Sequence, residues 1–322
     1  MPERRTTLAN ASASAMGSTT TRESTEALGA TSTLSDWVRL VRPRQWIKNG
    51  FVVAPLLFSG KAMQADAVWS SLGAFGAFCL VAAGIYCLND VFDQVGDRVH
   101  PTKRLRPVAA GRISSAAASV AGAVLIVASL FAGWSIAPRL GLALVAYVAL
   151  NLAYTTYLKH IVLVDVFAIA SFFVLRLLAG VAAIDVHPSL WLLLCGGLLS
   201  LYLGFAKRRH ELTLLGNGSA DHRAVLQHYD EATLDQISGI LLAVTVVSYI
   251  MYTLSSATAL AVGSEALSYS TAFVLFGVFR YVYLVRRKDA GDPTGLLLAD
   301  RTLLVDIALW IAYCGWVIYR PV

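Results

Sequence analysis

From Leu34 onward, long apolar windows alternate with short charged segments. Five windows contain no Asp, Glu, Lys, Arg or His and reach the roughly 18 residues that a membrane-spanning helix needs. They are Ala67–Asn89, Ser115–Ala137, Leu140–Leu158, Pro188–Ala206 and Gln236–Ser264. Four weaker segments are shorter or interrupted by charges: Asn49–Gly60, Ile161–Ile184, Ala266–Val285 and Ile307–Tyr319. Together the nine segments predict an all-α polytopic membrane protein with nine transmembrane helices.

Residues 1–33 have a different pattern, with thirteen Ser or Thr and no aromatic residue. Such a segment cannot bury enough apolar surface to offset the entropy of ordering, so we expect a disordered tail. It lacks the apolar run of about 7–15 residues that marks a signal peptide. The catalytic domain is therefore expected over residues 34–322, after a cytoplasmic tail.

Composition agrees with this pattern, since 57% of the residues are hydrophobic and only 14% are charged. A soluble domain is nearer 45–50% apolar and about 25% charged, so an ordinary water-soluble globule is excluded. Four cysteines lie in apolar stretches without CxxC spacing, which argues against a zinc site or a disulfide framework. Cys79, Cys87, Cys195 and Cys314 are expected in the core.

The distribution of positive charge predicts the orientation. Lys and Arg number 26 against 20 Asp and Glu. With nine spans and a cytoplasmic N-terminus, 21 of the 26 basic residues fall on the cytoplasmic side, as the positive-inside rule requires. The long cytoplasmic segments are 90–114, 207–235 and 286–306, so we expect the active site there. The predicted location is the inner (plasma) membrane.

The strongest local motif begins at Asn89, at the predicted cytoplasmic end of the second span. Asp90, Asp93 and Asp97 are spaced i, i+3, i+7, which places three carboxylates on one face of a helix. An acidic, solvated helix end is the simpler interpretation, but ionisable groups at a membrane boundary are usually functional. Oxygen ligands suit Mg²⁺, which takes further ligands from substrate phosphates. We predict Asp90, Asp93 and Asp97 as catalytic and, with Asn89, as metal ligands.

A basic segment follows directly, and its two prolines stop it from continuing as a regular helix. Its side chains can therefore fold back towards the acids. Positive-inside anchoring is the competing explanation. The candidates for substrate phosphates are Lys103 and Arg104, with Lys207 and Arg208 from the cytoplasmic segment 207–235.

Weaker substrate-binding candidates lie at other predicted span ends. For Arg42 and Arg44 an anchoring role is favoured. Asp165 and Arg176 are eleven residues apart and so share a helix face; lining of a cavity is favoured over salt bridges to other helices. The weaker candidates are Lys48, Tyr154, Lys159, Arg176, Arg223 and Tyr229.

Asn89-Asp90-xx-Asp93-xxx-Asp97, followed by a basic loop in a nine-span chain, resembles the UbiA superfamily of intramembrane prenyltransferases. Typical members carry a second acidic motif after the sixth span, where this chain has Lys207-Arg208-Arg209-His210-Glu211. That departure, with Arg42-Pro43-xx-Trp46-xx-Asn49 and Arg223-xx-Leu226-xx-Tyr229, looks like the decaprenyl-phosphate phosphoribosyltransferase branch.

The resemblance implies Mg²⁺-dependent transfer of 5-phosphoribose from phosphoribosyl diphosphate to a polyprenyl (decaprenyl) phosphate, with release of diphosphate, in cell-wall arabinan precursor synthesis. The implied partners are both substrates and the membrane, and no nucleic acid. Homo-oligomerisation stays open, because lipid-facing and partner-facing helix surfaces are both apolar. The alternatives are an aromatic prenyltransferase of quinone biosynthesis and, from another class, a secondary transporter that uses Asp165 and Arg176.

Overall fold

The computed structural model describes residues 33–215, 228–287 and 299–320, and these residues form helices and connecting turns without a strand. Two compact units are present. Unit 1 comprises Met1–Pro43 and Tyr86–Ala123, and unit 2 comprises Arg44–Ile85 and Val124–Val322. Residues 1–32 of the predicted tail, and the predicted site residue Arg223, lie outside the described residues.

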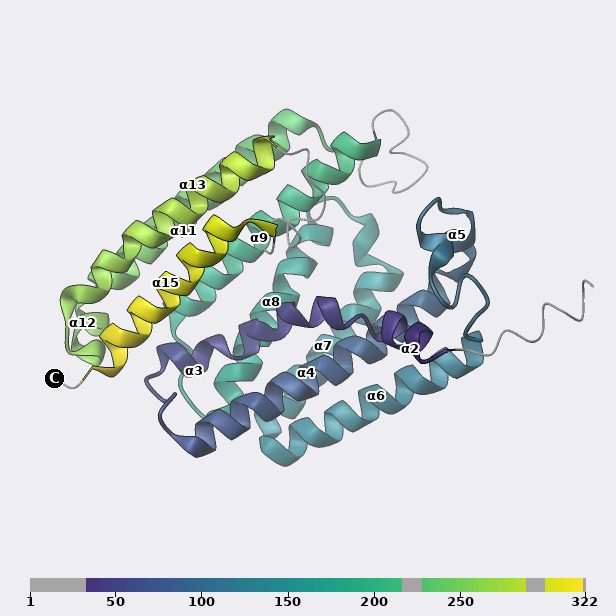
Figure 1. Cartoon of the computed structure of the whole chain (residues 1–322), viewed down its shortest axis with the longest axis horizontal. Helices are drawn as coiled ribbons and strands as arrows, with labels where there is room; N and C mark the ends of the chain where they lie inside the picture. Colours follow the sequence, from purple (N-terminus) through teal and green to yellow (C-terminus); the bar gives the residue numbers. More distant parts are fainter. Residues whose placement is uncertain (1–32, 216–227, 288–298, 321–322) are drawn as a thin grey trace, which may run out of the picture. The chain divides into compact units, whose positions relative to one another are not determined.

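Eight candidate spans occur in the described part of the chain, each long and apolar enough to cross a membrane. The all-α polytopic prediction is thus confirmed, and the protein is a multi-pass membrane protein. One candidate span, Glu265–Val285, consists of the 3₁₀ helix η6 (Glu265–Ser270) and most of helix α13 (Thr271–Arg287). The other seven lie in helices labelled in Figure 1: α4 (Ala65–Phe92), α6 (Ser115–Ile136), α7 (Pro138–Thr156), α8 (Val164–Ala183), α9 (Leu190–Leu215), α11 (Glu231–Leu254) and α15 (Arg301–Tyr319).

The count is one below the predicted nine because the first predicted segment is not one long helix. It is covered by the 3₁₀ helix η1 (Pro43–Val52) and the five-residue helix α3 (Ala54–Phe58). A further predicted window, Gln236–Ser264, contains two helices, α11 and α12 (Ser256–Val262). Between them Ser255 is extended, and its hydroxyl caps α12 by accepting a hydrogen bond from the backbone N–H of Thr258 at 3.2 Å.

Unit 2 is a helical bundle in which α7 packs on α8, α8 on α9 and α9 on α11. Helices α11, α13 and α15 lie side by side (Figure 1). Tyr147 stands at the centre of one core cluster, with ring centroids 5.2 Å from Phe78 and 5.3 Å from Phe172 in edge-to-face contacts. All four cysteines are thiols, three buried and Cys195 half-buried, as expected of packing residues.

A close backbone approach joins η1 to α8 within this bundle. A Cβ atom added to Gly180 would lie 2.0 Å from the carbonyl oxygen of Val52, far inside van der Waals contact. Glycine is therefore required at position 180. This approach holds the end of η1 against the last turn of α8.

Unit 1 contains α2 (Leu34–Val41), the last turns of α4, α5 (Gln94–Val99), the 3₁₀ helix η2 (Lys103–Leu105) and the first turns of α6. Thr33 is the N-cap residue of α2, and Asp36 Oδ2 accepts hydrogen bonds from the Thr33 hydroxyl at 2.9 Å and from the Thr33 backbone N–H at 3.3 Å. Asp36 also pairs with Arg112 at 2.7 Å, and hydrogen bonds from Arg112 and Thr33 lower the pKa of its carboxyl. The segment after η2 is thereby tied to α2.

Candidate functional site

The aspartate motif is interrupted at its middle residue. Helix α4 ends at Phe92 and α5 begins at Gln94, with Asp93 between them at φ −87° and ψ 1°. Asp90 and Asp97 are buried, at 1% and 3% exposure, whereas Asp93 is exposed. The predicted single helix face is therefore not observed, because Asp90 lies on α4 and Asp97 on α5; the two share burial, and Asp93 does not.

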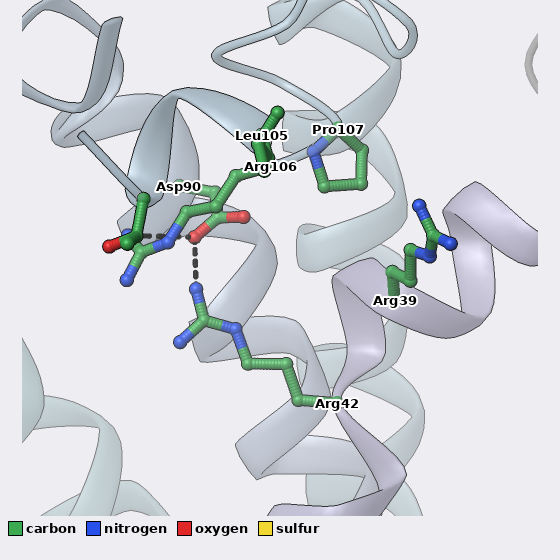
Figure 2. Close-up of a pocket in the computed structure, with 7 residues that line it drawn as sticks. Arg39, Arg42, Asp90, Leu105, Arg106 and Pro107 are labelled. Carbon is green, nitrogen blue, oxygen red and sulfur yellow. Dashed lines mark hydrogen bonds and ion pairs between the residues drawn. The ribbon is translucent and has the colours of Figure 1, made fainter. Parts of the chain in front are cut away.

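Two arginines neutralise these buried carboxylates, as Figure 2 shows for Asp90. Arg42 forms an ion pair through Nη2 with Oδ1 of Asp90. Arg106 Nη1 lies 2.5 Å from Oδ2 of Asp97 and 3.4 Å from Oδ1 of Asp90. Since one nitrogen contacts both oxygens, these oxygens are less than about 6 Å apart. The prediction that the basic loop folds back onto the acids is confirmed at Arg106.

Local structure places both arginines. Arg42 follows the last residue of α2 and adopts a left-handed conformation at φ 51° and ψ 61°, which turns the chain towards Pro43. Arg106 follows η2, in a segment whose backbone carbonyls are bound by side chains of α5. Gln94 Nε2 donates to Val108 O, and Arg98 Nε donates to Ala109 O, both at 3.3 Å.

These residues border a cavity of about 300 Å³. Three of the seven lining side chains are arginines and one is a carboxylate, so the cavity suits an anion better than a neutral ligand. The lining residues, drawn in Figure 2, are Arg39, Arg42, Asp90, Thr102, Leu105, Arg106 and Pro107.

The lining set differs from the predicted phosphate contacts. Lys103 and Arg104 lie on η2 in the same segment, but they are exposed and do not line this cavity. Arg42 and Arg106 were not among the predicted site residues. Arg42 belongs to the Arg42-Pro43 pair of the family resemblance, which could have marked it as a site residue. Arg106 precedes a proline that ends the basic segment, which could have marked it in the same way.

The donor set can be tested against Mg²⁺. No group of three or more His, Cys, Asp or Glu side chains that could hold a metal occurs within 33–215, 228–287 and 299–320. Asp90 and Asp97 nevertheless offer two neighbouring carboxylates, and both ion pairs of Asp90 use Oδ1. Asn89 is half-buried beside them. This set fits an ion that takes one or two carboxylates and completes its shell with water and phosphate oxygens, as Mg²⁺ does.

In unit 2, each of the three guanidinium nitrogens of Arg176 donates a hydrogen bond to a protein group. Its guanidinium donates to Asn49 Oδ1 at 2.9 Å, to the Phe172 carbonyl oxygen at 2.9 Å and to the Tyr147 hydroxyl at 2.8 Å. The centroid of the Tyr147 ring lies 4.9 Å from its Cζ atom. Arg176 is 4% exposed, so these contacts describe a packing centre.

Asp165 pairs with Arg208 of α9. Arg208 Nε donates to Asp165 Oδ2 at 2.8 Å, and Nη1 donates to Glu211. Both members of the Asp165–Arg208 pair have fully buried side chains. The prediction of cavity lining by Asp165 is thus replaced by a salt bridge between helices.

Tyr229 completes this cluster from the segment before α11. Its hydroxyl donates to Asp165 Oδ1 at 3.2 Å and accepts the backbone N–H of Leu163 at 2.7 Å. Leu163 has φ 66° and ψ −45°, and Val164 N bonds to Val162 O at 2.8 Å, the pattern of a strained γ-turn. Burial raises the pKa of Tyr229 to about 12, so the hydroxyl remains a donor at neutral pH.

The other predicted residues of unit 2 are more accessible. Tyr154 packs edge-on against Phe172 with ring centroids 5.9 Å apart. Lys48 on η1 and Lys159 on the 3₁₀ helix η3 (Leu158–His160) are half-buried, and Lys207 on α9 is exposed.

Comparison with known proteins gives concordant results. The model of the UbiA prenyltransferase family matches residues 51–304. Decaprenyl-phosphate phosphoribosyltransferase from Mycolicibacterium smegmatis is 34% identical over 296 residues, 89% of this chain and 93% of that protein. The enzyme of the same name from Corynebacterium glutamicum is 31% identical over 282 residues, 85% of this chain and 84% of that protein. A UbiA homolog from Archaeoglobus fulgidus, solved with GPP and Mg²⁺, has a TM-score of 0.64 at 19% identity and covers 88% of this chain and 100% of that chain.

Proposed function

This chain belongs to the UbiA prenyltransferase family and is a transferase, and from that premise we propose that it transfers 5-phosphoribose from phosphoribosyl diphosphate to a polyprenyl phosphate, releasing diphosphate. The observation that carries the proposal is the 34% identity to a decaprenyl-phosphate phosphoribosyltransferase over 89% of the chain. The arginine-lined cavity beside Asp90 supports it, because the donor and the acceptor are both anionic.

Asp90, which lines the cavity, and Asp97, which shares Arg106 with Asp90, would hold Mg²⁺, with Asn89 and Asp93 as further oxygen donors. Bound Mg²⁺ would neutralise charge on the departing diphosphate. Arg39, Arg42 and Arg106 would bind phosphate oxygens and orient the donor so that C1 of the ribose is open to attack. The lipid phosphate is anionic at neutral pH, so positioning and charge neutralisation would supply most of the catalysis.

The predicted contacts outside the cavity keep distinct roles in this proposal. Lys103, Arg104 and Lys207 are accessible cations for donor phosphates, and Lys48, Tyr154 and Lys159 are weaker contacts for donor or acceptor. Arg223 remains a predicted contact of the same class. Arg176, Arg208 and Tyr229 are engaged by protein groups, so we assign them to positioning.

The cellular setting follows from the same reaction. We propose a role in supplying phosphoribosyl lipid for cell-wall arabinan, at the inner membrane, with the N-terminus and the site facing the cytoplasm. The basic segments on that side support the orientation. The transporter alternative loses its basis, because the charges that suggested it, Asp165 and Arg176, are occupied in packing contacts.

The test is transfer of label by the purified full-length chain in detergent. With Mg²⁺, labelled phosphoribosyl diphosphate and decaprenyl phosphate, label should enter the organic phase. Asp97→Asn should lower kcat by roughly 10²–10³, the usual cost of losing one group that stabilises developing charge. Asp66→Asn, an exposed acid in the first turn of α4, is the matched control and should retain activity. Label transferred only from a prenyl diphosphate to an aromatic acid would establish the aromatic prenyltransferase instead.

A further inference from the structure

Ion pairs with Arg42 and Arg106 cover the two buried carboxylates, Asp90 and Asp97, that would hold the metal. The side chains of Asp90 and Asp97 are 2% and 5% exposed, whereas those of Arg42 and Arg106 are 27% and 26% exposed. A divalent cation that approaches from solvent therefore meets the guanidiniums first. The charges of the four groups cancel, so the carboxylates do not present an open acidic patch.

We propose that Arg42 and Arg106 are exchangeable counter-cations, which occupy Asp90 and Asp97 when metal is absent and pass to substrate phosphate when metal binds. This inference rests on the proposed function, since it assigns a metal and a diphosphate to the same site. It adds that the two arginines compete with the metal and thereby make metal binding depend on the diphosphate.

Charge explains the dependence. The three carboxylates of Asp90, Asp93 and Asp97 and the three guanidiniums of Arg39, Arg42 and Arg106 sum to zero, and a divalent cation would leave this group at +2. In partly buried surroundings an uncompensated charge of this size is unfavourable. A diphosphate restores the balance, because it binds the metal and also accepts the displaced guanidiniums. Metal and diphosphate should then favour each other's binding reciprocally.

Geometry allows the exchange without a change of fold. Arg42 and Arg106 are long side chains whose heads reach the cavity, and both contact the same oxygen of Asp90, Oδ1 (Figure 2). The cavity of about 300 Å³ is open to solvent, so a hydrated metal and a diphosphate group can enter it. Rotation of the side chains alone would carry each guanidinium from a carboxylate to a phosphate oxygen.

The experiment measures binding of Mn²⁺ to the full-length chain in detergent by electron paramagnetic resonance, without any substrate. Arg42→Gln and Arg106→Gln should each bind Mn²⁺ about tenfold more tightly than wild type, within the 5- to 150-fold range of typical coupling. Arg44→Gln removes an exposed arginine of η1 and should leave the affinity unchanged. Adding Asp97→Asn to Arg106→Gln should abolish the gain.

Equal or weaker Mn²⁺ binding in both arginine variants would overturn the proposal, as would absence of binding in all of them at millimolar Mn²⁺. If one variant fails to fold, as judged by its thermal unfolding, the other still decides the result. A second measurement uses wild type alone, where Mn²⁺ with inorganic diphosphate should raise the unfolding temperature more than the two added separately. Neither measurement involves ribose transfer, so the exchange can fail while label transfer succeeds, and the reverse.

Discussion

Two neighbouring arginines of α9 form ion pairs of nearly equal length in different surroundings, and this contrast yields a quantitative prediction. Arg208 lies 2.8 Å from Asp165, and both side chains are 0% exposed. Arg209 lies 2.9 Å from Asp235 of α11, with side chains 27% and 44% exposed. Replacing either acid by the isosteric Asn removes a charge and almost no volume, so burial is the main variable.

Removing one partner of a buried ion pair costs about 3–5 kcal/mol, because the remaining charge is left uncompensated in a medium that solvates it poorly. Glu211 still contacts Arg208, so we expect Asp165→Asn to lower the free energy of unfolding by about 3 kcal/mol, the lower end of that range. An exposed ion pair contributes about 0–1 kcal/mol, and this is the expected cost of Asp235→Asn.

The assay is unfolding of the full-length chain in mild detergent titrated with dodecyl sulfate, followed by the fluorescence of its seven tryptophans. The double variant Asp165→Asn with Arg208→Met should lose less than the sum of the two single variants, because it leaves no buried arginine without its acid. Losses for Asp165→Asn and Asp235→Asn that agree within about 0.5 kcal/mol would refute the assignment of the buried pair as a main support of the α8–α9 contact.

Three further outcomes are expected. Gly180→Ala should destabilise the bundle by about 1–3 kcal/mol in the same titration, because its Cβ would meet the Val52 carbonyl, whereas Gly76→Ala, with open space around its Cβ, should be neutral or stabilising. Burial raises the pKa of the Tyr229 hydroxyl from 10.0 to about 12, so the stability that its protonated form gives the folded state is complete below pH 10 and is lost as the pH rises through 12. In Tyr229→Phe, this fall in the free energy of unfolding at alkaline pH should be missing. Removal of divalent cations with EDTA should abolish phosphoribosyl transfer and excess Mg²⁺ should restore it, and activity that persists in EDTA would contradict the metal assignment.

The hydropathy of the sequence predicted most of the helices, because each membrane-spanning helix must by itself be long and apolar enough to cross the bilayer. The predicted Ser115–Ala137 and the observed α6 differ by one residue at one end. The break at Ser255 was missed, since the flanking residues are equally apolar and the cap depends on one hydroxyl. For the same reason η1 and α3 were expected as one helix.

The site was predictable where its residues are close in sequence and not where they are distant. Asp90 and Asp97 are seven residues apart and both contact Arg106, although the break at Asp93 places them on two consecutive helices. Arg42 is 48 residues from Asp90, and no periodicity connects the two. Pairing of Asp165 with Arg208 likewise depends on which helices are neighbours, and apolar helix surfaces do not encode this in their composition.

Helix α8 has a consequence for the order in which the protein is built. Helix α8 carries two charged residues, Asp165 and Arg176. Asn49 and Tyr147, which bind Arg176, are synthesised before α8. Arg208 and Tyr229, which bind Asp165, are synthesised after it, 43 and 64 residues further along the chain. Until α9 emerges from the ribosome, the nascent α8 carries a carboxylate without its counter-charge, and a charge near the centre of a span opposes insertion by about 2.5–3.5 kcal/mol. Asp165 is the second residue of α8, near one end, so the cost is smaller but present. We therefore expect α8 and α9 to enter the bilayer as a hairpin. Glycosylation tagging of nascent chains should show less insertion of α8 when synthesis stops before Leu190 than when α9 is complete.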